Sequence, residues 1–229
     1  MQIQIKPNAF FIFDLDDTLY PEVDFVCSGF QHIADQLQQF IDYPLFPQMW
    51  NLFVQRANVF EFLVDTFKDI VPGISVAGLL QAYRHHIPTL TLPEGSRMLL
   101  QQLTCLKIPA GLITDGRSIT QRNKIKALGL EHYFKDVIIS EEFGSAKPAE
   151  RNFRYFINQY PTSNFFFVGD NTSKDFQVPT RLGWFTICLK NDGRHIHPQN
   201  FSAMAQPSCI VESLGQLQLL QLQDCPGFP

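Results

Sequence analysis

Residues 8–18, which read NAFFIFDLDDT, join an almost continuous apolar run to a cluster of acidic side chains. An apolar run of this length without polar alternation predicts a strand that is buried on both faces, as in a parallel sheet. The acidic side chains of Asp14, Asp16 and Asp17 follow at the carboxyl end of that strand. Because open α/β sheets bind ligands at the carboxyl ends of their strands, this cluster is a candidate site.

Further apolar runs follow along the chain and alternate with stretches that have a helical pattern. Alternation of this kind predicts β-α-β units, and right-handed crossovers then place helices on both faces of the sheet. We therefore predict an α/β fold with a Rossmann-like parallel sheet. The expected strands cover residues 8–15, 108–114, 136–139, 164–169 and 184–189, and the expected helices cover residues 94–106, 117–128, 149–160 and 173–181.

The segment 21–92 breaks this alternation, because its pattern is helical throughout and is interrupted only by proline and glycine. We predict a helical cap domain over residues 21–92, inserted into a core domain formed by residues 1–20 and 93–229. Within the cap, helices are expected at residues 27–41, 47–67 and 76–86. At the other end of the chain, the Gln- and Leu-rich residues 214–224 predict a closing helix.

Composition narrows the classes of function. The hydrophobic content of 45%, with 22 Phe, predicts a large core, and a net charge of −4 gives no electrostatic footprint for nucleic acid or an anionic membrane. No window approaches the ~20 apolar residues that span a bilayer, so we expect no membrane segment. The five cysteines are irregularly spaced, which favours reduced thiols in a cytoplasmic protein over a disulfide framework or a zinc site.

The ends of three later strands also carry polar residues. Thr114 and Asp115 stand at the start of a predicted helix, where a hydroxyl and main-chain N–H groups can cradle a phosphate; an ordinary helix cap is the alternative. Lys147 precedes another helix and could equally be a solvated surface charge. Asp170 and Asp175 could complete a metal site or cap a helix. Clustered carboxylates with oxygen-only ligands favour a hard cation such as Mg²⁺.

Taken together, four motifs carry a family resemblance. They read DLDDT (14–18), LITDG (112–116), GSAKP (144–148) and VGD (168–170) with Asp175. In this order, at the ends of four predicted strands, they closely resemble the motifs of haloacid dehalogenase-like (HAD) phosphohydrolases. The long interval between the first two motifs is similar to that of family members with a helical cap inserted after the first strand.

The resemblance implies roles for the residues that match the motifs. Asp14 would attack phosphorus and form an aspartyl-phosphate, while Asp16 would act as general acid and then as general base. Asp14, the main-chain carbonyl of Asp16, and Asp170 would hold Mg²⁺, with Asp175 as a supporting partner. A carboxylate that attacks a phosphate dianion faces charge repulsion, which a divalent cation and a lysine would offset.

The other motif residues would bind the phosphoryl group. Thr114 and the N–H of Asp115 would contact its oxygens, and Lys147 would stabilise charge on it. Asp115 departs from the family pattern, in which Asn is frequent, and we expect its side chain to turn away and cap the following helix. Asp17 and Thr18 are expected to be structural, with Thr18 fixing the loop through hydrogen bonds.

The resemblance implies a phosphatase of a small phosphorylated metabolite, either a nucleoside monophosphate or a sugar or other metabolite phosphate. A phosphomutase of the same family stays open, and a hydrolytic dehalogenase without metal is an alternative, although Asp16 together with Asp170 favours phosphate chemistry. A phosphonate-cleaving enzyme would need Lys68 in the cap, and a surface charge at a helix end is the preferred interpretation of that lysine. A non-catalytic binding protein of the same fold is the alternative from another class. For Tyr20, Glu22, Phe25 and Arg56, core packing or a solvated surface is preferred to substrate contact. The oligomeric state stays open.

Overall fold

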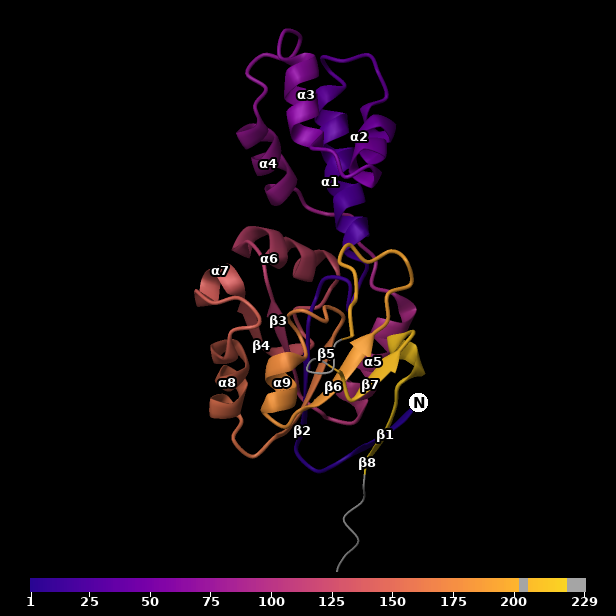
Figure 1. Cartoon of the computed structure of the whole chain (residues 1–229), viewed down its shortest axis with the longest axis vertical. Helices are drawn as coiled ribbons and strands as arrows, with labels where there is room; N and C mark the ends of the chain where they lie inside the picture. The colour runs from indigo at the N-terminus through magenta and orange to yellow at the C-terminus, as the bar shows by residue number, and fades with distance from the viewer. Residues whose placement is uncertain (202–205, 222–229) are drawn as a thin grey trace, which may run out of the picture.

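The computed structural model describes residues 1–201 and 206–221, and has two parts stacked along its long axis (Figure 1). The lower part contains a six-stranded sheet in the order β4-β3-β2-β5-β6-β7, in which every neighbouring pair is parallel. The predicted parallel sheet is therefore confirmed. Its strands are β2 (Ala9–Phe13), β3 (Ala110–Thr114), β4 (Phe134–Ile139), β5 (Asn164–Gly169), β6 (Phe185–Leu189) and β7 (Cys209–Val211).

Helices cover both faces of this sheet, and the central strand β2 shows why the sequence requires them. Phe11 and Phe13 pack into one apolar cluster, whereas Phe10 and Ile12 pack into another on the opposite face. The first cluster is closed by α5 (Glu94–Cys105) and α6 (Ser118–Ala127), and the second by α8 (Glu150–Gln159) and α9 (Gln177–Arg181). The short helix α7 (Ser140–Phe143) follows β4.

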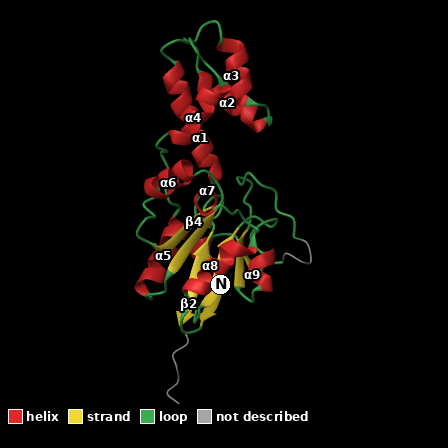
Figure 2. Cartoon of the chain, turned by 90° about the vertical axis from the view of Figure 1, so that its left-hand side faces the viewer, coloured by secondary structure: helices red, strands yellow, loops and turns green. Residues whose placement is uncertain are grey.

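The upper part consists of four helices around an apolar cluster of their own (Figures 1 and 2). The expected helix over residues 47–67 is wrong as one element: Arg56 has a positive φ of 59°, and Asn58 caps a new helix by accepting the N–H of Glu61. The assignment of residues 21–92 to a separate cap domain stays a prediction. The helices are α1 (Glu22–Leu37), α2 (Leu45–Val54), α3 (Val59–Phe67) and α4 (Val76–His85).

The two ends of the described chain form a separate parallel pair of strands, β1 (Gln2–Ile5) and β8 (Gln218–Gln221). The closing helix expected over residues 214–224 is therefore wrong as far as residue 221, because only the 3-10 turn η1 (Leu214–Gln216) precedes β8. Leu217 and Leu219 are buried on either side of an exposed residue, which is the period of a strand. Residues 222–224 lie outside the described residues. In the part of the chain that is described, no helix is long and apolar enough to cross a membrane.

Candidate active site

The predicted site residues converge at the carboxyl edge of the sheet, around a small cavity of about 90 Å³. The motif side chains reach it from the ends of β2, β3 and β5 and from the loop before α8. Asp175 lies behind the cavity wall and is fully buried. The residues that line the cavity are Asp14, Asp16, Asp17, Glu22, Thr114, Asp115, Lys147, Asp170, Asn171, Lys174 and His197.

A buried lysine joins two of the acidic motifs. Lys147 Nζ lies 2.7 Å from Asp14 Oδ1 and 2.7 Å from Asp175 Oδ1, and its side chain is only 3% exposed. Burial raises the pKa of Asp14 well above its usual value; Lys147 opposes this rise, and Asp175 and Asp170 add to it. Burial disfavours charge on Lys147, but Asp14 and Asp175 hold the pKa of this lysine above its usual value. Lys147 is therefore a cation that one cluster of carboxylates shares.

Three of these carboxylates could hold a metal ion. One oxygen each from Asp14, Asp170 and Asp175 lies within 4.8 Å of the others. Carboxylate oxygens are the ligands that Mg²⁺ and other hard cations prefer. Lys147 pairs with two of these three buried carboxylates, Asp14 and Asp175, and supplies a single positive charge, so a divalent cation would balance the excess negative charge. The donor set and its charge thus fit a hard divalent cation.

Asp175 also shapes the loop that carries Asp170. Its Oδ2 accepts the main-chain N–H of Asp170 at 3.2 Å and that of Asn171 at 2.9 Å. A Cβ at Gly169 would lie 2.5 Å from Asp175 Oδ2, so only glycine permits this close approach. The expected helix over residues 173–181 begins only at Gln177, because this turn occupies its first residues.

Asp16 is held by side chains that the sequence analysis did not assign to the site. Its Oδ1 accepts hydrogen bonds from Tyr20 Oη at 2.6 Å and Lys124 Nζ at 2.7 Å, and its Oδ2 accepts one from Gln121 Nε2 at 2.8 Å. Burial alone would raise the pKa of Asp16, but Lys124, Tyr20 and Gln121 together lower it. In this arrangement Asp16 is an ionised carboxylate bound to α6.

Thr114 is poised to donate a hydrogen bond. Gln121 Nε2 donates to Thr114 Oγ1 at 2.5 Å, so the hydroxyl oxygen acts as an acceptor and its hydrogen is available for another oxygen. Thr114 is 1% exposed and lines the cavity. This geometry suits the predicted contact with a phosphoryl oxygen.

The prediction that Asp115 caps the following helix is wrong. Asp115 Oδ1 accepts the main-chain N–H of Lys147 at 3.0 Å, and its Oδ2 lies 3.3 Å from Lys174 Nζ. At the start of α6, the free main-chain N–H of Ser118 donates instead to the Glu141 carboxylate at 2.7 Å. Asp115 therefore ties the loop after β3 to the loop that carries Lys147, a long-range contact that local helix-capping preference does not reveal.

Asp17 and Thr18 are structural, as expected. The two oxygens of Asp17 accept the main-chain N–H groups of Glu22 and Ile196, each at 2.8 Å. Thr18 Oγ1 donates to Asp170 Oδ1 at 3.3 Å. Asp17 therefore starts α1 and anchors a distant segment, while Thr18 links the first and last motifs.

Lys124 and Gln121 are the main residues that the sequence did not reveal. They are three residues apart and so share one face of α6. That face is buried: Gln121 is 1% exposed and Lys124 is 3% exposed. A buried helix face with an amide and an ammonium instead of apolar side chains indicates polar partners. The partner that both residues share is Asp16, in the loop after β2 and more than a hundred residues away.

Of the candidate substrate contacts in and beside the predicted cap, Tyr20 and Glu22 do reach the site: Tyr20 is bonded to Asp16, and Glu22 lines the cavity. Burial, and then Asp16, raises the pKa of Glu22 to about 8. Phe25 packs under Lys124, whose Nζ lies 4.4 Å from the ring centroid. Arg56 and Lys68 are exposed and do not line the cavity, which agrees with a solvated surface and leaves a Lys68-dependent reaction without support.

Comparison with known proteins now decides the family. The family profile described as haloacid dehalogenase-like hydrolase matches residues 11–188. The chain is a member of the haloacid dehalogenase-like hydrolases. Among solved structures of this fold, the HAD-hydrolase YfnB of Bacillus subtilis, bound to magnesium, superimposes with a TM-score of 0.64 at 21% identity, over 91% of this chain and 96% of that one.

Curated relatives of this haloacid dehalogenase-like chain include proteins named as phosphatases and one named as a nucleotidase. Glyceraldehyde 3-phosphate phosphatase of Methanocaldococcus jannaschii is 30% identical over 208 residues, which is 83% of this chain and 89% of the relative. N-acylneuraminate-9-phosphatase of Homo sapiens is 31% identical over 140 residues, covering 59% of this chain and 54% of the relative. Pyrimidine 5'-nucleotidase YjjG of Escherichia coli is 33% identical over 113 residues, or 48% of each chain.

Proposed function

We propose that this protein is a Mg²⁺-dependent phosphatase that hydrolyses a small-molecule phosphate monoester through an aspartyl-phosphate on Asp14. One observation carries the proposal: Asp14, Asp170 and Asp175 present carboxylate oxygens within 4.8 Å of one another, and Lys147 pairs with two of them, Asp14 and Asp175. Thr114 lines the same cavity as Asp14, Asp170 and Lys147. Such a site offers a nucleophile, cation ligands, a fixed positive charge and a hydroxyl donor around one position. The curated relatives, named as phosphatases, support the reaction class.

The proposed reaction has two steps. First, a carboxylate oxygen of Asp14 attacks phosphorus while the bond from phosphorus to the ester oxygen breaks, and Asp16 gives a proton to the departing oxygen. Second, a water molecule attacks the phosphorus of the aspartyl-phosphate, Asp16 takes its proton, and the bond to Asp14 breaks to release phosphate. Lys147 and Thr114 contact the phosphoryl oxygens throughout, where positive charge and a fixed donor stabilise the transition state.

Asp16 must change partners before it can act as the acid of the first step. It is now ionised and bound to Lys124, Tyr20 and Gln121. A phosphate dianion that enters the cavity adds negative charge nearby, which favours protonation of this carboxyl group. When Asp16 has given up its proton, the carboxylate can again accept the hydrogen bonds from Lys124 and Gln121 of α6.

Asp14, Asp170 and the main-chain carbonyl of Asp16 are the proposed ligands of Mg²⁺, with Asp175 supporting the loop of Asp170. When bound, the cation would offset the repulsion between the Asp14 carboxylate and the phosphate dianion. The oxygen-only donor set supports a hard cation and gives no reason to expect zinc or another soft metal.

The substrate is proposed to be a small phosphorylated metabolite whose leaving group lies toward the cap. The cavity of about 90 Å³ is small beside the roughly 300–1,000 Å³ of a typical small-molecule pocket. It has room for a phosphoryl group and a cation, and little more. The leaving group would therefore extend out of the cavity toward the upper helices, where Glu22, the first residue of α1, lines the cavity.

Removal of divalent metal is the test of the proposed reaction. We expect hydrolysis of an aryl phosphate to cease after dialysis against a chelator and to return with Mg²⁺. Calcium, which prefers more ligands and longer bonds, should restore much less activity. Phosphate release is the measurement, and a 2-haloacid serves as the alternative substrate. Full activity in chelator, or halide release from the haloacid, would contradict the proposal and favour a hydrolytic dehalogenase.

Replacement of Asp16 by alanine (Asp16→Ala) is expected to act unequally on different leaving groups. An alkyl alkoxide needs a proton to depart, so phosphorylation of the enzyme by a sugar or nucleoside phosphate should slow by roughly 10²–10⁴-fold. A nitrophenolate departs as an anion, so its step should slow much less. Single-turnover phosphorylation by both esters is the measurement, because steady-state rates also contain the second step. Equal losses would mean that Asp16 acts through loop or metal geometry and not as an acid.

A further inference from the structure

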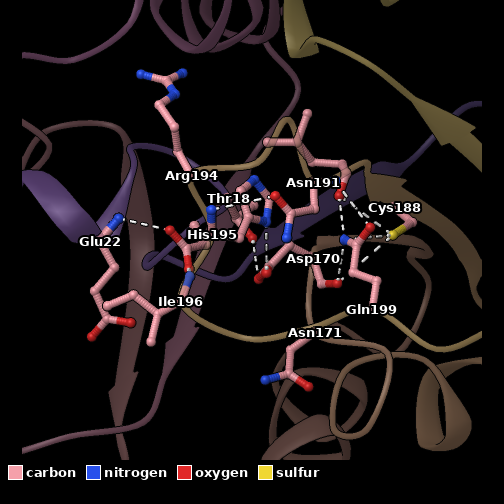
Figure 3. A network of polar contacts seen from close by, with 12 residues as sticks. Thr18, Glu22, Asp170, Asn171, Cys188, Asn191, Arg194, His195, Ile196 and Gln199 are labelled. Atoms are coloured by element: carbon pink, nitrogen blue, oxygen red, sulfur yellow. Dashed lines mark hydrogen bonds and ion pairs between the residues drawn. The ribbon is translucent and has the colours of Figure 1, made fainter. Parts of the chain in front are cut away.

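The segment of residues 190–200, which follows β6, crosses the loops that carry the proposed metal ligands (Figure 3). Gln199 Nε2 donates to the main-chain carbonyl of Asp170 at 2.8 Å, and the N–H of Asn200 donates to Thr172 Oγ1 at 2.9 Å. The N–H of Ile196 donates to Asp17, and the Ile196 side chain packs against the apolar cluster of the upper helices. The segment is thus attached to the first motif, the last motif and the cap.

Within this segment, one imidazole contacts a proposed metal ligand directly. His195 Nδ1 lies 3.1 Å from Asp170 Oδ2, and the two side chains are 6% and 3% exposed (Figure 3). A carboxylate oxygen accepts hydrogen bonds, so Nδ1 carries the hydrogen in this contact. Thr18 donates to the other oxygen of Asp170, and each oxygen keeps a further lone pair for a cation.

The surrounding main chain fixes the imidazole in this position. Asn191 Oδ1 accepts the N–H groups of Gly193 and His195, at 2.6 and 3.3 Å, and so holds the turn before the imidazole. On the other side, the N–H of Ile196 is held by Asp17. The main chain on both sides of His195 is therefore held by side-chain acceptors, and this places the buried ring beside Asp170.

Direct coordination by His195 is the competing explanation, because ligand atoms of Asp17, Asp170 and His195 also lie within 4.8 Å of one another. Both oxygens of Asp17, however, already accept main-chain N–H groups. The nitrogen of His195 that faces Asp170 is engaged as a donor. Asp14 and Asp170, by contrast, offer carboxylate oxygens, which are harder donors than imidazole nitrogen, and both line the cavity that Lys147 also lines.

We propose that His195 is a positioning residue of the metal site, whose Nδ1–H orients the Asp170 carboxylate for the cation. This inference rests on the proposed function, because it takes Asp170 to be a metal ligand. Hydrogen-bond partners of metal ligands commonly change metal affinity about 10–100-fold when they are removed. His195 would act on the cation through Asp170, and through no contact with the substrate.

The test compares two amides at the same position. Asparagine places an amide nitrogen at the position of Nδ1 and should keep the hydrogen bond, whereas glutamine places it one bond further away and should not. We expect His195→Gln and His195→Leu to raise the dissociation constant for Mn²⁺ about 10-fold or more, and His195→Asn to stay within about threefold of the parent. Free Mn²⁺ is measured by electron paramagnetic resonance on the full chain, with no substrate present.

Controls separate this inference from the proposed function. His132→Ala removes an exposed imidazole and should leave Mn²⁺ binding unchanged, whereas Asp170→Asn should abolish tight binding. In activity assays, His195→Gln should raise the Mg²⁺ concentration for half-activation by the same factor and leave kcat at saturating Mg²⁺ within about threefold of the parent.

The outcomes are distinct. If Asp170→Asn weakens Mn²⁺ binding but all three His195 variants bind as the parent does, the inference is overturned and the metal site stands. If Asp170→Asn binds Mn²⁺ normally, the proposed metal site itself fails. Nitrogen hyperfine coupling from a coordinated imidazole in the parent, lost in His195→Asn, would assign His195 as a direct ligand and overturn the positioning role. Equal weakening by asparagine and glutamine would also contradict it.

Discussion

Replacement of Asp14 by asparagine (Asp14→Asn) is expected to lower turnover by about four orders of magnitude or more, the scale on which loss of a catalytic nucleophile acts. The amide has nearly the shape of the carboxylate but cannot attack phosphorus. Lys147 keeps its ion pair with Asp175 at 2.7 Å, so the buried ammonium group is not left without a negatively charged partner. The fold should persist, as measured by circular dichroism together with phosphate release.

The same variant should be no less stable than the parent in metal-free buffer at neutral pH. Because burial raises the pKa of Asp14, this carboxyl group contributes stability that is present below its unfolded pKa and lost as the pH rises through the folded value. Asparagine does not titrate and so does not lose this stability. The free energy of unfolding of the variant should therefore rise relative to that of the parent between acid and neutral pH. Asp35→Asn, on the exposed face of α1, is the control and should change neither turnover nor stability. Turnover by Asp14→Asn near the parental rate would contradict the assignment.

Replacement of Lys147 by methionine (Lys147→Met) is expected to damage both stability and activity. It leaves Asp14 and Asp175 buried without their shared cation, and removal of one partner from a buried ion pair costs about 3–5 kcal/mol. The loss should grow as the pH rises, since protonation relieves the unpaired carboxylates at low pH. Turnover should also fall by roughly 10²–10³-fold, as when one donor to the transition state is removed. Urea denaturation in chelator, at acid and at neutral pH, measures the loss of stability.

Lys174→Met is the matched control for stability. Lys174 also faces the site, but it is 40% exposed and lies 3.3 Å from Asp115, so its loss should cost no more than about 1 kcal/mol. If Lys147→Met were as stable as Lys174→Met in metal-free buffer at neutral pH, the buried cluster would not depend on its lysine, contrary to the geometry.

Much of the fold could be predicted because its strands are buried on both faces. The run from Ala9 to Phe13 is apolar at every position, and its alternate side chains pack on opposite faces of the sheet. The motif residues follow such strands directly, so their convergence at one edge of the sheet follows from parallel topology. Short strands at the ends were missed, because β1, β7 and β8 have only three or four residues each and little pattern to detect.

The residues that surround the motifs could not be predicted, because their roles depend on contacts between distant segments. Lys124 approaches Asp16 from α6, and His195 approaches Asp170 from a segment without apolar periodicity. Asp115 was assigned to a helix cap on local preference, but tertiary structure directs it to Lys147 and Lys174. Local pattern identifies strands and their polar ends, while hydrogen-bond partners across loops require the structure.

The most direct measurement is rapid acid quenching of the enzyme with Mg²⁺ and an aryl phosphate, followed by peptide mass spectrometry. Asp16→Ala is the enzyme of choice alongside the parent, because it lacks the base of the second step and should accumulate the intermediate. The proposed mechanism predicts one added phosphoryl group on the peptide that contains Asp14, and none in Asp14→Asn or in chelator. Phosphate release by the parent without any phosphorylated Asp14 in either enzyme, or a phosphoryl group on a different residue, would contradict it.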